Sequence, residues 1–293
     1  MTRESRNSPA ARRIAFATWR DLPRLSSDDR LAAAALEGRG VTVVPAVWDD
    51  PAVDWPGFDT VVVRSTWDYH HRPDAFLGWI AALERGGVQL WNPPPLLRWN
   101  LDKRYLAELG RRGVAVVPTV TVPKGGEPSL ADVLGDAGWD LAVVKPAVSA
   151  SAHETWRTSR EQAGADASRF ARLVHAGDVL VQPYLSAVEA GEWSLCFLGG
   201  RYSHAVLKRP RAGDFRVQYE LGGAVVVAPP PAALVAQAEA IVALLEEPWL
   251  YARVDACLVD GSLVLMELEL IEPTLFFHAD RDAPARFADA LRA

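Results

Sequence analysis

The sequence has little of what marks several large classes of protein. Its 293 residues include only two cysteines, Cys196 and Cys257, and no Cys-x-x-Cys spacing. Buried thiols are therefore the simplest interpretation, and neither a redox motif nor a cysteine-bound metal is indicated. No apolar run approaches the ~20 residues that cross a bilayer. The first residues, MTRESRNSPAARR, lack an apolar segment, which is typical of a loose tail and not of a signal peptide. We expect a cytoplasmic protein without a membrane partner.

Two further absences narrow the class of ligand. The formal net charge is −6 and basic residues form no clustered patch, so nothing in the sequence favours a nucleic acid as partner. No Walker A sequence occurs in the chain. Hydrophobic residues make up 49% of the sequence, which suits one large domain or two to three lobes. A homo-oligomer is left open, because sequence pattern does not distinguish an exposed interface from a core.

The first third of the chain alternates between strand and helix patterns. This alternation predicts an α/β fold with a parallel sheet, and ligands of such sheets bind beyond the carboxyl ends of the strands. We expect a helix in SSDDRLAAAALEGRG and another from Pro73 to about Arg85. The predicted strands are residues 13–19, 41–48, 59–65 and 88–92.

Three consecutive prolines in WNPPPLLRWN interrupt this pattern, and we place a domain boundary there because proline continues neither a helix nor a central strand. Beyond it the pattern becomes α+β, with two hairpins that turn at Gly199-Gly200 and at Asp260-Gly261. The predicted domains are 12–92 for substrate, 93–185 for nucleotide and 186–293 for a C-terminal lobe with a metal site. Further helices are expected in residues 101–113, 168–177, 230–247 and 283–293, and further strands in 118–122, 140–146 and 179–185.

Charged residues follow or interrupt several apolar strands. Lys145 follows DLAVV, Lys208 follows SHAVL, Asp255 follows YARV, and Glu267 and Glu269 interrupt LVLMELEL. Carboxylates on the two arms of one hairpin can come close enough to share Mg²⁺, with the basic residues neutralising phosphate oxygens. The alternative is a surface hairpin with glutamates on its outer face. Either way, Met266, Leu268 and Leu270 are expected to form the opposite, apolar face.

RSTWDYHH, residues 64–71, follows the third predicted strand at the position where such sheets bind ligands. Arg64 can pair with a substrate carboxylate, Asp68 with an ammonium group, and Trp67 and Tyr69 can form walls. Alternatively, the aromatic residues pack on the next helix. Three histidines lie in or near this site: His70, His71 and, in the loop after Lys145, His153. Each either contacts a ligand or occupies a solvated or core position.

Together these segments resemble the ATP-grasp superfamily, and in particular its glutathione synthetase and ribosomal-protein glutamate ligase branch. The similar segments are NLDK, VVKP, VQPYL, KRPRAGDFRVQYELGG and MELELIEPT. RSTWDYH and paired serines are similar to the branch of cyclo-ligases that closes the isoxazolidinone ring of cycloserine from O-ureido-D-serine. The resemblance implies an ATP-grasp fold preceded by a parallel-sheet pre-ATP-grasp domain.

The resemblance also implies roles for individual residues. Lys208 and Arg216 would be catalytic, facing the transferring phosphate and the acyl oxygens, and Asp255, Glu267 and Glu269 would hold two Mg²⁺ ions, for which Mn²⁺ can substitute. Substrate would bind at Arg64, Ser65, Trp67, Asp68, Tyr69 and Gln218, the last near the metals. ATP would bind at Lys103, Lys145, Ser149, Ser151, Gln182, Tyr184, Leu185 and Glu189.

Two positions depart from the family pattern. Glu269 stands where most relatives have asparagine, and the added negative charge requires one more cationic contact. The loop AVSASAHET after Lys145 has no glycine, whereas relatives use glycines there to bring backbone amides to the phosphates. Ser149 and Ser151 are expected to supply hydroxyl groups instead.

We therefore expect an ADP-forming C–N ligase that converts the carboxylate of a small amino-acid-like substrate into an acyl phosphate, which a nitrogen nucleophile then attacks. The nucleophile belongs either to a second molecule or to the same one. The competing hypotheses are a catalytically silent ATP-binding regulatory protein, which the glycine-free loop motivates, and an ATP-grasp phosphotransferase.

Overall fold

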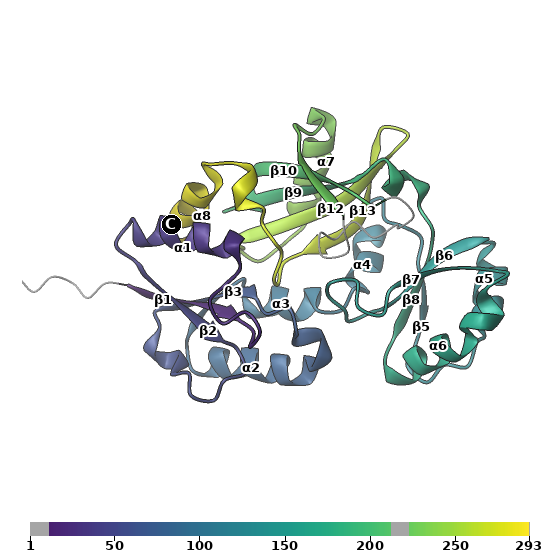
Figure 1. Ribbon diagram of the computed structural model, residues 1–293, viewed down its shortest axis with the longest axis horizontal. Coiled ribbons are helices and arrows are strands. Elements are labelled where there is room, and N and C mark those ends of the chain that lie inside the picture. Colours follow the sequence, from purple (N-terminus) through teal and green to yellow (C-terminus); the bar gives the residue numbers. More distant parts are fainter. Residues whose placement is uncertain (1–11, 212–222, 293) are drawn as a thin grey trace, which may run out of the picture.

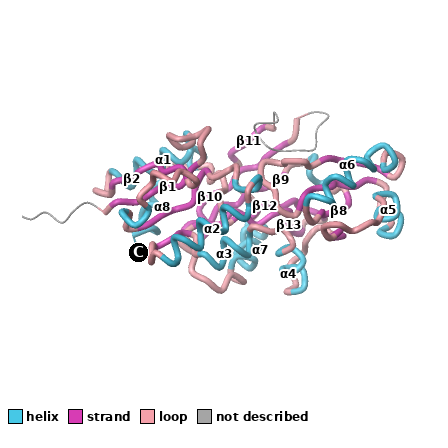
Figure 2. Tube along the Cα trace, turned by 90° about the horizontal axis from the view of Figure 1, so that it is seen from below, coloured by secondary structure: helices cyan, strands magenta, loops and turns pink. Residues whose placement is uncertain are grey.

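The chain forms three β-sheets that follow one another along the sequence. The computed structural model describes residues 12–292 apart from 212–222. Figure 2 shows the N-terminal sheet at one end, α5 and α6 at the other, and the strands of the third sheet between them. The predicted α/β class is confirmed, with a parallel N-terminal sheet and two antiparallel sheets after it. Among the described helices, none has the length and apolar composition needed to span a membrane.

The N-terminal sheet is parallel, as predicted, with the strand order β2-β1-β3-β4. Its third strand is buried along its whole length, which explains why its sequence does not alternate between apolar and polar residues. Ser26 caps the first helix by accepting a hydrogen bond from the Asp29 N–H. The elements are β1 (Arg13–Thr18), α1 (Ser27–Glu37), β2 (Thr42–Val47), β3 (Thr60–Ser65), α2 (Pro73–Arg85) and β4 (Gln89–Trp91).

The last helix, α8 (Ala283–Arg292), packs against α1 of the N-terminal domain as well as against β9 and β10 of the third sheet (Figure 1). Phe287 and Leu291 of α8 share one apolar cluster with Phe16 of β1 and Leu36 of α1. The C-terminal segment therefore covers a face of the N-terminal sheet. The predicted domain limits do not describe this packing, and the division into three domains stays a prediction.

The central sheet is antiparallel, with the order β5-β8-β6-β7. Its strands are β5 (Val120–Val122), β6 (Leu141–Pro146), β7 (Trp156–Ser159) and β8 (Val179–Pro183), and its helices are α5 (Leu130–Ala137) and α6 (Ala163–Ala176). The sequence analysis missed α5 and β7. Both are short, and β7 follows directly on the loop whose turns hide its pattern.

The sequence analysis placed a domain boundary at the proline run and predicted no helix there, but a helix begins within it. Helix α3 (Pro94–Asn100) begins inside it, with Pro93 at the N-cap and proline in the first turn. Proline is tolerated there because the first N–H groups of a helix have no partner within the helix. The next helix, α4, is shorter than predicted and spans Tyr105–Arg111, so Lys103 lies in the turn between the two.

The third sheet carries the two predicted hairpins. Its order is β11-β10-β9-β12-β13, and every pairing is antiparallel. Both cysteines lie in it as free, buried thiols, as expected. The strands are β9 (Glu192–Leu198), β10 (Arg201–Arg209), β11 (Ala224–Val227), which the sequence analysis missed, β12 (Tyr251–Val259) and β13 (Ser262–Glu269), with helix α7 (Ala232–Val242).

Side chains from the α3–α4 segment pair with the open edge of β13. The Asn100 amide donates to the Leu268 carbonyl (2.7 Å) and accepts from the Leu270 N–H (2.8 Å). The Tyr105 hydroxyl donates to the same Leu268 carbonyl and accepts from the Leu268 N–H, both at 2.8 Å. These bonds satisfy backbone groups of Leu268 and Leu270 at the edge of β13, beyond the bridge between Val116 and Leu265, and they fix the Lys103 turn beside the carboxylates of β13.

We expect Asn100→Ala to destabilise the fold by about 1–3 kcal/mol, because it leaves the buried Leu270 N–H without its partner and removes one of the two hydrogen bonds to the Leu268 carbonyl. Urea unfolding measures this change. Gln162→Ala serves as the control, since Gln162 is exposed at the start of α6, and it should change the unfolding free energy by no more than about 0.5 kcal/mol. An equal, small effect of both substitutions would contradict the proposed edge pairing.

Candidate active site

The predicted metal-binding carboxylates lie on one face of the β12–β13 hairpin. The strand register pairs Asp255 with Glu267 and Arg253 with Glu269. Cross-strand neighbours of an antiparallel pair have their Cβ atoms about 5 Å apart, so the expected proximity of Asp255 and Glu267 is confirmed. The same face continues onto β9, where Ser194 is the cross-strand neighbour of Asp255.

A β-bulge in this hairpin corrects one detail of the sequence analysis. Asp255 pairs with Glu267 but Ala256 pairs with Leu265, so Met266 is the extra residue. Leu268 lies in the apolar core, as predicted, but Met266 packs with Val188 and Cys257 on the carboxylate face. Tyr184, Leu185 and Ala187 pack against the same small cluster. Two of the residues predicted at the adenine edge therefore adjoin an apolar surface that includes Met266.

Lys103 is the cation nearest Glu267. Its Nζ lies 3.0 Å from the Glu267 carboxylate and donates a hydrogen bond to the Ser149 carbonyl, while its backbone N–H donates to the Ala147 carbonyl at 2.9 Å. Burial acts to lower the pKa of Lys103, but the carboxylates of Glu267, Glu269 and Glu272 outweigh burial, and the pKa is raised. Lys103 thus remains charged and joins β13 to the loop after β6.

Asp255 and Lys208 form the most buried ion pair of the face. Lys208 Nζ lies 2.9 Å from Asp255 and 2.6 Å from Glu192, its cross-strand neighbour. Asp255 also accepts hydrogen bonds from Ser194 Oγ (2.6 Å) and from the Arg253 guanidinium. Although burial raises the pKa of Asp255, the charges of Arg253 and Lys208 lower it well below its usual range. The same carboxylates raise the pKa of Lys208 despite its burial.

Arg253 is the cation that Glu269 requires. Its guanidinium bonds both Asp255 and Glu269 and donates to the Thr274 carbonyl at 3.0 Å. The sequence analysis predicted that the glutamate at this position needs one more cationic contact but did not identify Arg253. The signal was present, because YARVDA puts Arg253 two residues before Asp255 and hence on the same face of the strand.

Lys145 lies close to the cluster without a fixed partner. Within the described residues it makes no ion pair and no side-chain hydrogen bond. Burial lowers its pKa, and the nearby charge of Lys103 lowers it further, although Glu267 and Glu192 act in the opposite direction. A half-buried ammonium group without a counter-ion is suited to an incoming anion.

The pKa values of Glu269 and Glu272 are raised above that of an isolated glutamate, so both carboxyl groups keep their proton to a higher pH. Burial raises the pKa of Glu269 to about 7, because Arg253 only partly offsets it and Asp255 and Glu267 add repulsion. Burial, followed by the charges of Glu269 and Glu267, raises the pKa of Glu272 to about 8. Within the described residues, Glu272 has no ion pair.

The donor set fits hard divalent cations. Oxygen ligands from several carboxylates are what Mg²⁺ takes in proteins. The raised pKa values of Glu269 and Glu272 indicate negative charge that the protein does not neutralise by itself. A cation bound there would share the Asp255 carboxylate with Lys208 and Arg253. Among the described residues the carboxylates of this region outnumber the cations: Glu192, Asp255, Glu267, Glu269 and Glu272 face Lys103, Lys145, Lys208 and Arg253.

The predicted adenine and ribose contacts lie around the end of β8. Gln182 is buried and its amide donates to Thr119 Oγ1 (2.9 Å). The Tyr184 N–H donates to the Leu141 carbonyl (2.9 Å), and the Tyr184 hydroxyl donates to Glu189 at 2.9 Å. Glu189 ends a short helix, η3 (Ser186–Glu189), that follows Leu185. The structure brings these residues together, and their nucleotide contacts stay predictions.

The loop after β6 has an unusual backbone. Ser151, Ala152 and Glu154 adopt positive φ angles of 51°, 53° and 49°, a region where glycine is preferred. Ser149 is buried and its hydroxyl donates to the Pro146 carbonyl (3.2 Å), whereas Ser151 is exposed. The chain thus makes the turns of a glycine-rich loop with other residues.

We call residues 64–71, RSTWDYHH, the acceptor segment, because they are predicted to bind the substrate. The side chains of its first residues make their hydrogen bonds inside the protein. Arg64 is 1% exposed, and its guanidinium donates to Asp29 (2.8 Å) and to the Pro273 carbonyl (2.8 Å) while lying over the Tyr251 ring. Ser65 Oγ donates to the same aspartate. Asp29 thus supplies the carboxylate that we expected from substrate, although Arg64 Nη1 has no partner among the described residues.

The remaining residues of the acceptor segment also contact other parts of the protein. Asp68 bonds Arg72 (2.8 Å) and Trp48 Nε1 (2.8 Å), and Tyr69 is buried against Phe76. Trp67 is the most accessible to a ligand, and its Nε1 donates to the Glu272 carbonyl at 3.2 Å. This bond brings the acceptor segment to the end of β13. The predictions for Arg216 and Gln218 lie outside the described residues.

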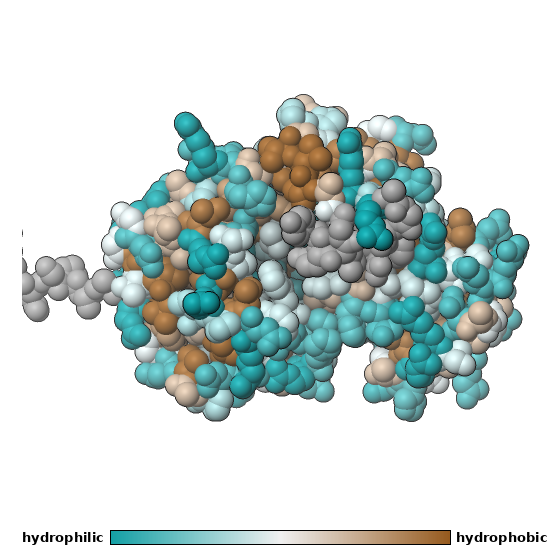
Figure 3. All heavy atoms as spheres, viewed as in Figure 1, coloured by the Kyte–Doolittle hydropathy of each residue, from teal (hydrophilic) through white to brown (hydrophobic). Residues whose placement is uncertain are grey.

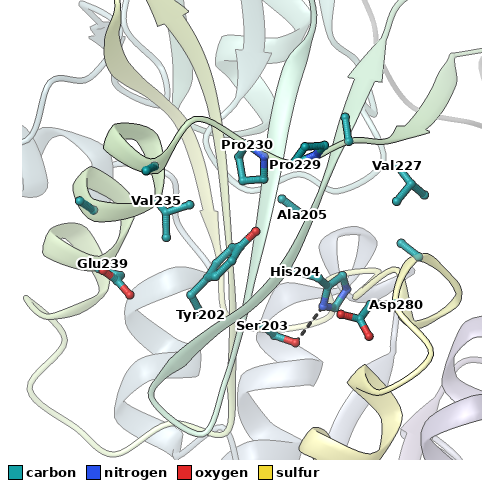
Figure 4. A pocket seen from close by; sticks show the side chains of 14 residues that line it. Tyr202, Ser203, His204, Ala205, Val227, Pro229, Pro230, Val235, Glu239 and Asp280 are labelled. Carbon is teal, nitrogen blue, oxygen red and sulfur yellow. Dashed lines mark hydrogen bonds between the residues drawn. The ribbon is translucent and has the colours of Figure 1, made fainter.

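A second depression lies away from this cluster. It has a volume of about 570 Å³, and Figure 4 shows Tyr202 and His204 of β10 and Val235 and Glu239 of α7 around it. None of the predicted site residues lines it. On the outer surface, Figure 3 shows apolar patches over the N-terminal domain and a notch between that domain and the central lobe.

Comparisons with known proteins connect this geometry to a family. The model of the D-cycloserine synthetase DcsG N-terminal domain matches residues 14–92. The chain is 35% identical over 275 residues to the cycloserine biosynthesis protein DcsG of Streptomyces lavendulae, covering 86% of this chain and 88% of that protein.

Two solved structures agree with this relationship. The crystal structure of D-cycloserine synthetase DcsG matches with a TM-score of 0.85 and 33% identity, over 95% of this chain and 98% of that chain. The ATP complex of D-alanine–D-alanine ligase from Bacillus anthracis matches with a TM-score of 0.69 and 16% identity, over 96% of each chain. The chain therefore belongs to the DcsG family of ATP-grasp ligases.

Proposed function

We propose that this ADP-forming ligase activates the carboxylate of a small amino acid as an acyl phosphate and closes a ring through a nitrogen of the same molecule, in the manner of O-ureido-D-serine conversion to D-cycloserine. The observation that carries the proposal is the β12–β13 face, where ionised carboxylates lie together with Lys145, which has no counter-ion among the residues that the structure describes. The identity to DcsG, which extends through the acceptor segment, supports the substrate class.

The residues of this face suit phosphoryl transfer in distinct ways. Magnesium, when bound, would neutralise phosphate oxygens and polarise the transferring group. Lys103 keeps Glu267 ionised, and Lys208 with Arg253 keeps Asp255 ionised, so these carboxylates stay available as ligands at neutral pH. Lys145 would hold a phosphate oxygen of ATP. Met266 and Cys257 would form the apolar floor beneath the base.

The reaction then needs positioning more than a protein nucleophile. The substrate carboxylate attacks the γ-phosphorus, the bond to the β-phosphate oxygen breaks, and ADP leaves. The pendant nitrogen attacks the acyl carbon, loses a proton to solvent, and expels inorganic phosphate. Trp67, held to the Glu272 carbonyl, would keep the substrate near β13.

We expect Glu267→Gln to lower ADP formation at least 10²-fold, because the substitution removes a charged oxygen ligand and leaves Lys103 without its partner. A coupled ADP assay with Mg²⁺ measures the rate, and circular dichroism checks the fold. Glu161→Gln, at an exposed position before α6, is the matched control and should leave the rate unchanged. Normal turnover by Glu267→Gln would remove the proposed metal role.

Ring closure makes ATP consumption independent of any added amine. With O-ureido-D-serine as the only amino-acid substrate, we expect ADP, inorganic phosphate and a cyclic product by mass spectrometry. Oxygen-18 in the substrate carboxylate should appear in the phosphate, because the acyl phosphate carries that oxygen. ATP consumption only with a separate amine would replace the intramolecular reaction by an intermolecular one, and a stable phosphate ester would indicate a phosphotransferase.

The unneutralised negative charge should make the metal-free protein less stable at alkaline pH. Folding raises the pKa of Glu272 from 4.5 to about 8, so the folded state holds an extra proton that it loses as the pH rises through 8. Between pH 6.5 and 8.5 we expect a loss of about 1–2 kcal/mol in urea unfolding with EDTA present. Glu269, whose pKa is raised to about 7, loses its proton in the same window and adds to this loss. Glu272→Gln should therefore reduce the pH-dependent loss without abolishing it, and an unchanged profile would contradict the assignment.

A further inference from the structure

Three histidines lie together at the junction of the N-terminal domain and the loop after β6. His70 and His71 come from the short helix η2 (Tyr69–His71), and His153 comes from the loop. Their ring centroids are 4.0 Å (His70 to His71), 5.0 Å (His70 to His153) and 4.8 Å (His71 to His153) apart. One nitrogen from each ring lies within 4.8 Å of the others. Two segments about 80 residues apart thus present three imidazoles to one point.

This spacing is close to that of a metal site. Ligand nitrogens that bind zinc at 2.0–2.1 Å in a tetrahedral arrangement are about 3.4 Å from one another. His71 and His153 are exposed, so rotation of their side chains can shorten the distances without moving the backbone. Three protein nitrogens leave one coordination position for water or for an oxygen of a bound ligand.

His70 is suited to bind a cation rather than an anion. Both of its ring nitrogens are buried, and neither makes a hydrogen bond of ordinary geometry within the described residues, although the backbone of Trp67 lies near. Burial lowers the pKa of His70 to about 4, with further contributions from His71 and His153. The ring is therefore neutral at physiological pH and keeps a free lone pair. The charge of Lys103 lies close enough to affect it but is matched by Glu267.

The loop that carries His153 has an unfavourable backbone conformation, which needs contacts to maintain it. Ser151 and Ala152 directly before it, and Glu154 after it, have positive φ angles, which are unfavourable for residues other than glycine. Such conformations persist where surrounding contacts determine them. The Glu154 side chain bonds Arg169 of α6, but that exposed pair contributes little. His153 meets His70 and His71 of the N-terminal domain, beside the contacts that Val148 and Ala150 make with its apolar cluster.

We propose that His70, His71 and His153 form a binding site for a divalent transition metal, which joins the loop after β6 to the N-terminal domain. The chemical class is a borderline cation such as Zn²⁺, Co²⁺ or Ni²⁺, because imidazole suits these ions whereas Mg²⁺ prefers oxygen ligands. The site uses none of the carboxylates of the β12–β13 face. It stands independently of the proposed function.

Titration of the nucleotide-free protein with Co²⁺ tests the site, with excess Mg²⁺ present to occupy the carboxylates. We expect one Co²⁺ per chain and the visible absorption of a low-coordinate nitrogen site. His153→Ala, at an exposed position, should weaken binding at least 10-fold without affecting the fold. His175→Ala, on the exposed surface of α6, is the control and should bind as the native chain does. Absence of Co²⁺ binding, or equal affinity of His153→Ala and the native chain, would overturn the proposal.

Amide hydrogen exchange tests the joining of the two segments. Zn²⁺ should slow exchange in residues 147–155 and 66–72 of the native chain and of His175→Ala, and should have no such effect on His153→Ala. Unchanged exchange in the native chain after Zn²⁺ has bound would show that the metal does not join these segments. Neither measurement involves ATP, so their outcome is separate from that of the proposed ligase activity.

Discussion

The balance of charge on the β12–β13 face is the constraint on which the site depends. Burying a carboxylate is costly unless a cation or a hydrogen-bond donor accompanies it. Here Asp255, Glu267 and Glu269 are each held by a cation from a different place: Lys208 from β10, Lys103 from the turn after α3, and Arg253 from β12 itself. The remaining carboxylate, Glu272, has no such partner among the described residues and keeps its proton at neutral pH. The cations of this face thus come from two strands of the third sheet and from the turn between α3 and α4.

The rest of the fold can be understood as support for this arrangement. Asn100 and Tyr105 pair with the free edge of β13, which fixes the position of the Lys103 turn between them. Asn92 plays a similar part, because its amide donates to the carbonyls of Tyr251 and Leu270 and accepts from the Leu250 N–H. Polar side chains thereby replace a neighbouring strand at the edge where the lobes meet.

The N-terminal domain is joined to the same region by a buried polar network. Arg64 bonds Asp29 and the Pro273 carbonyl, and the hydroxyl of Tyr251 donates to the Val63 and Ile271 carbonyls. Removing one partner of a buried ion pair costs about 3–5 kcal/mol, so Arg64 stabilises the contact between β3 and the segment after β13. Because Arg64 and Ser65 are buried, the residues of the acceptor segment that a ligand can reach are Trp67 and the histidines that follow it.

The sequence by itself determined the α/β class, the parallel N-terminal sheet, both hairpins and the proximity of Asp255 to Glu267, because hydrophobic period, turn residues and strand register are local properties. It also indicated that Glu269 requires a cation. Only the tertiary structure decided which cation pairs with which carboxylate, that Asp29 pairs with Arg64, that a bulge turns Met266 to the other face, and that α8 packs on α1. These depend on contacts between residues far apart in the chain, which neither period nor propensity encodes. The proline run shows the same limit on a local scale, since proline that ends a pattern in one context begins a helix in another.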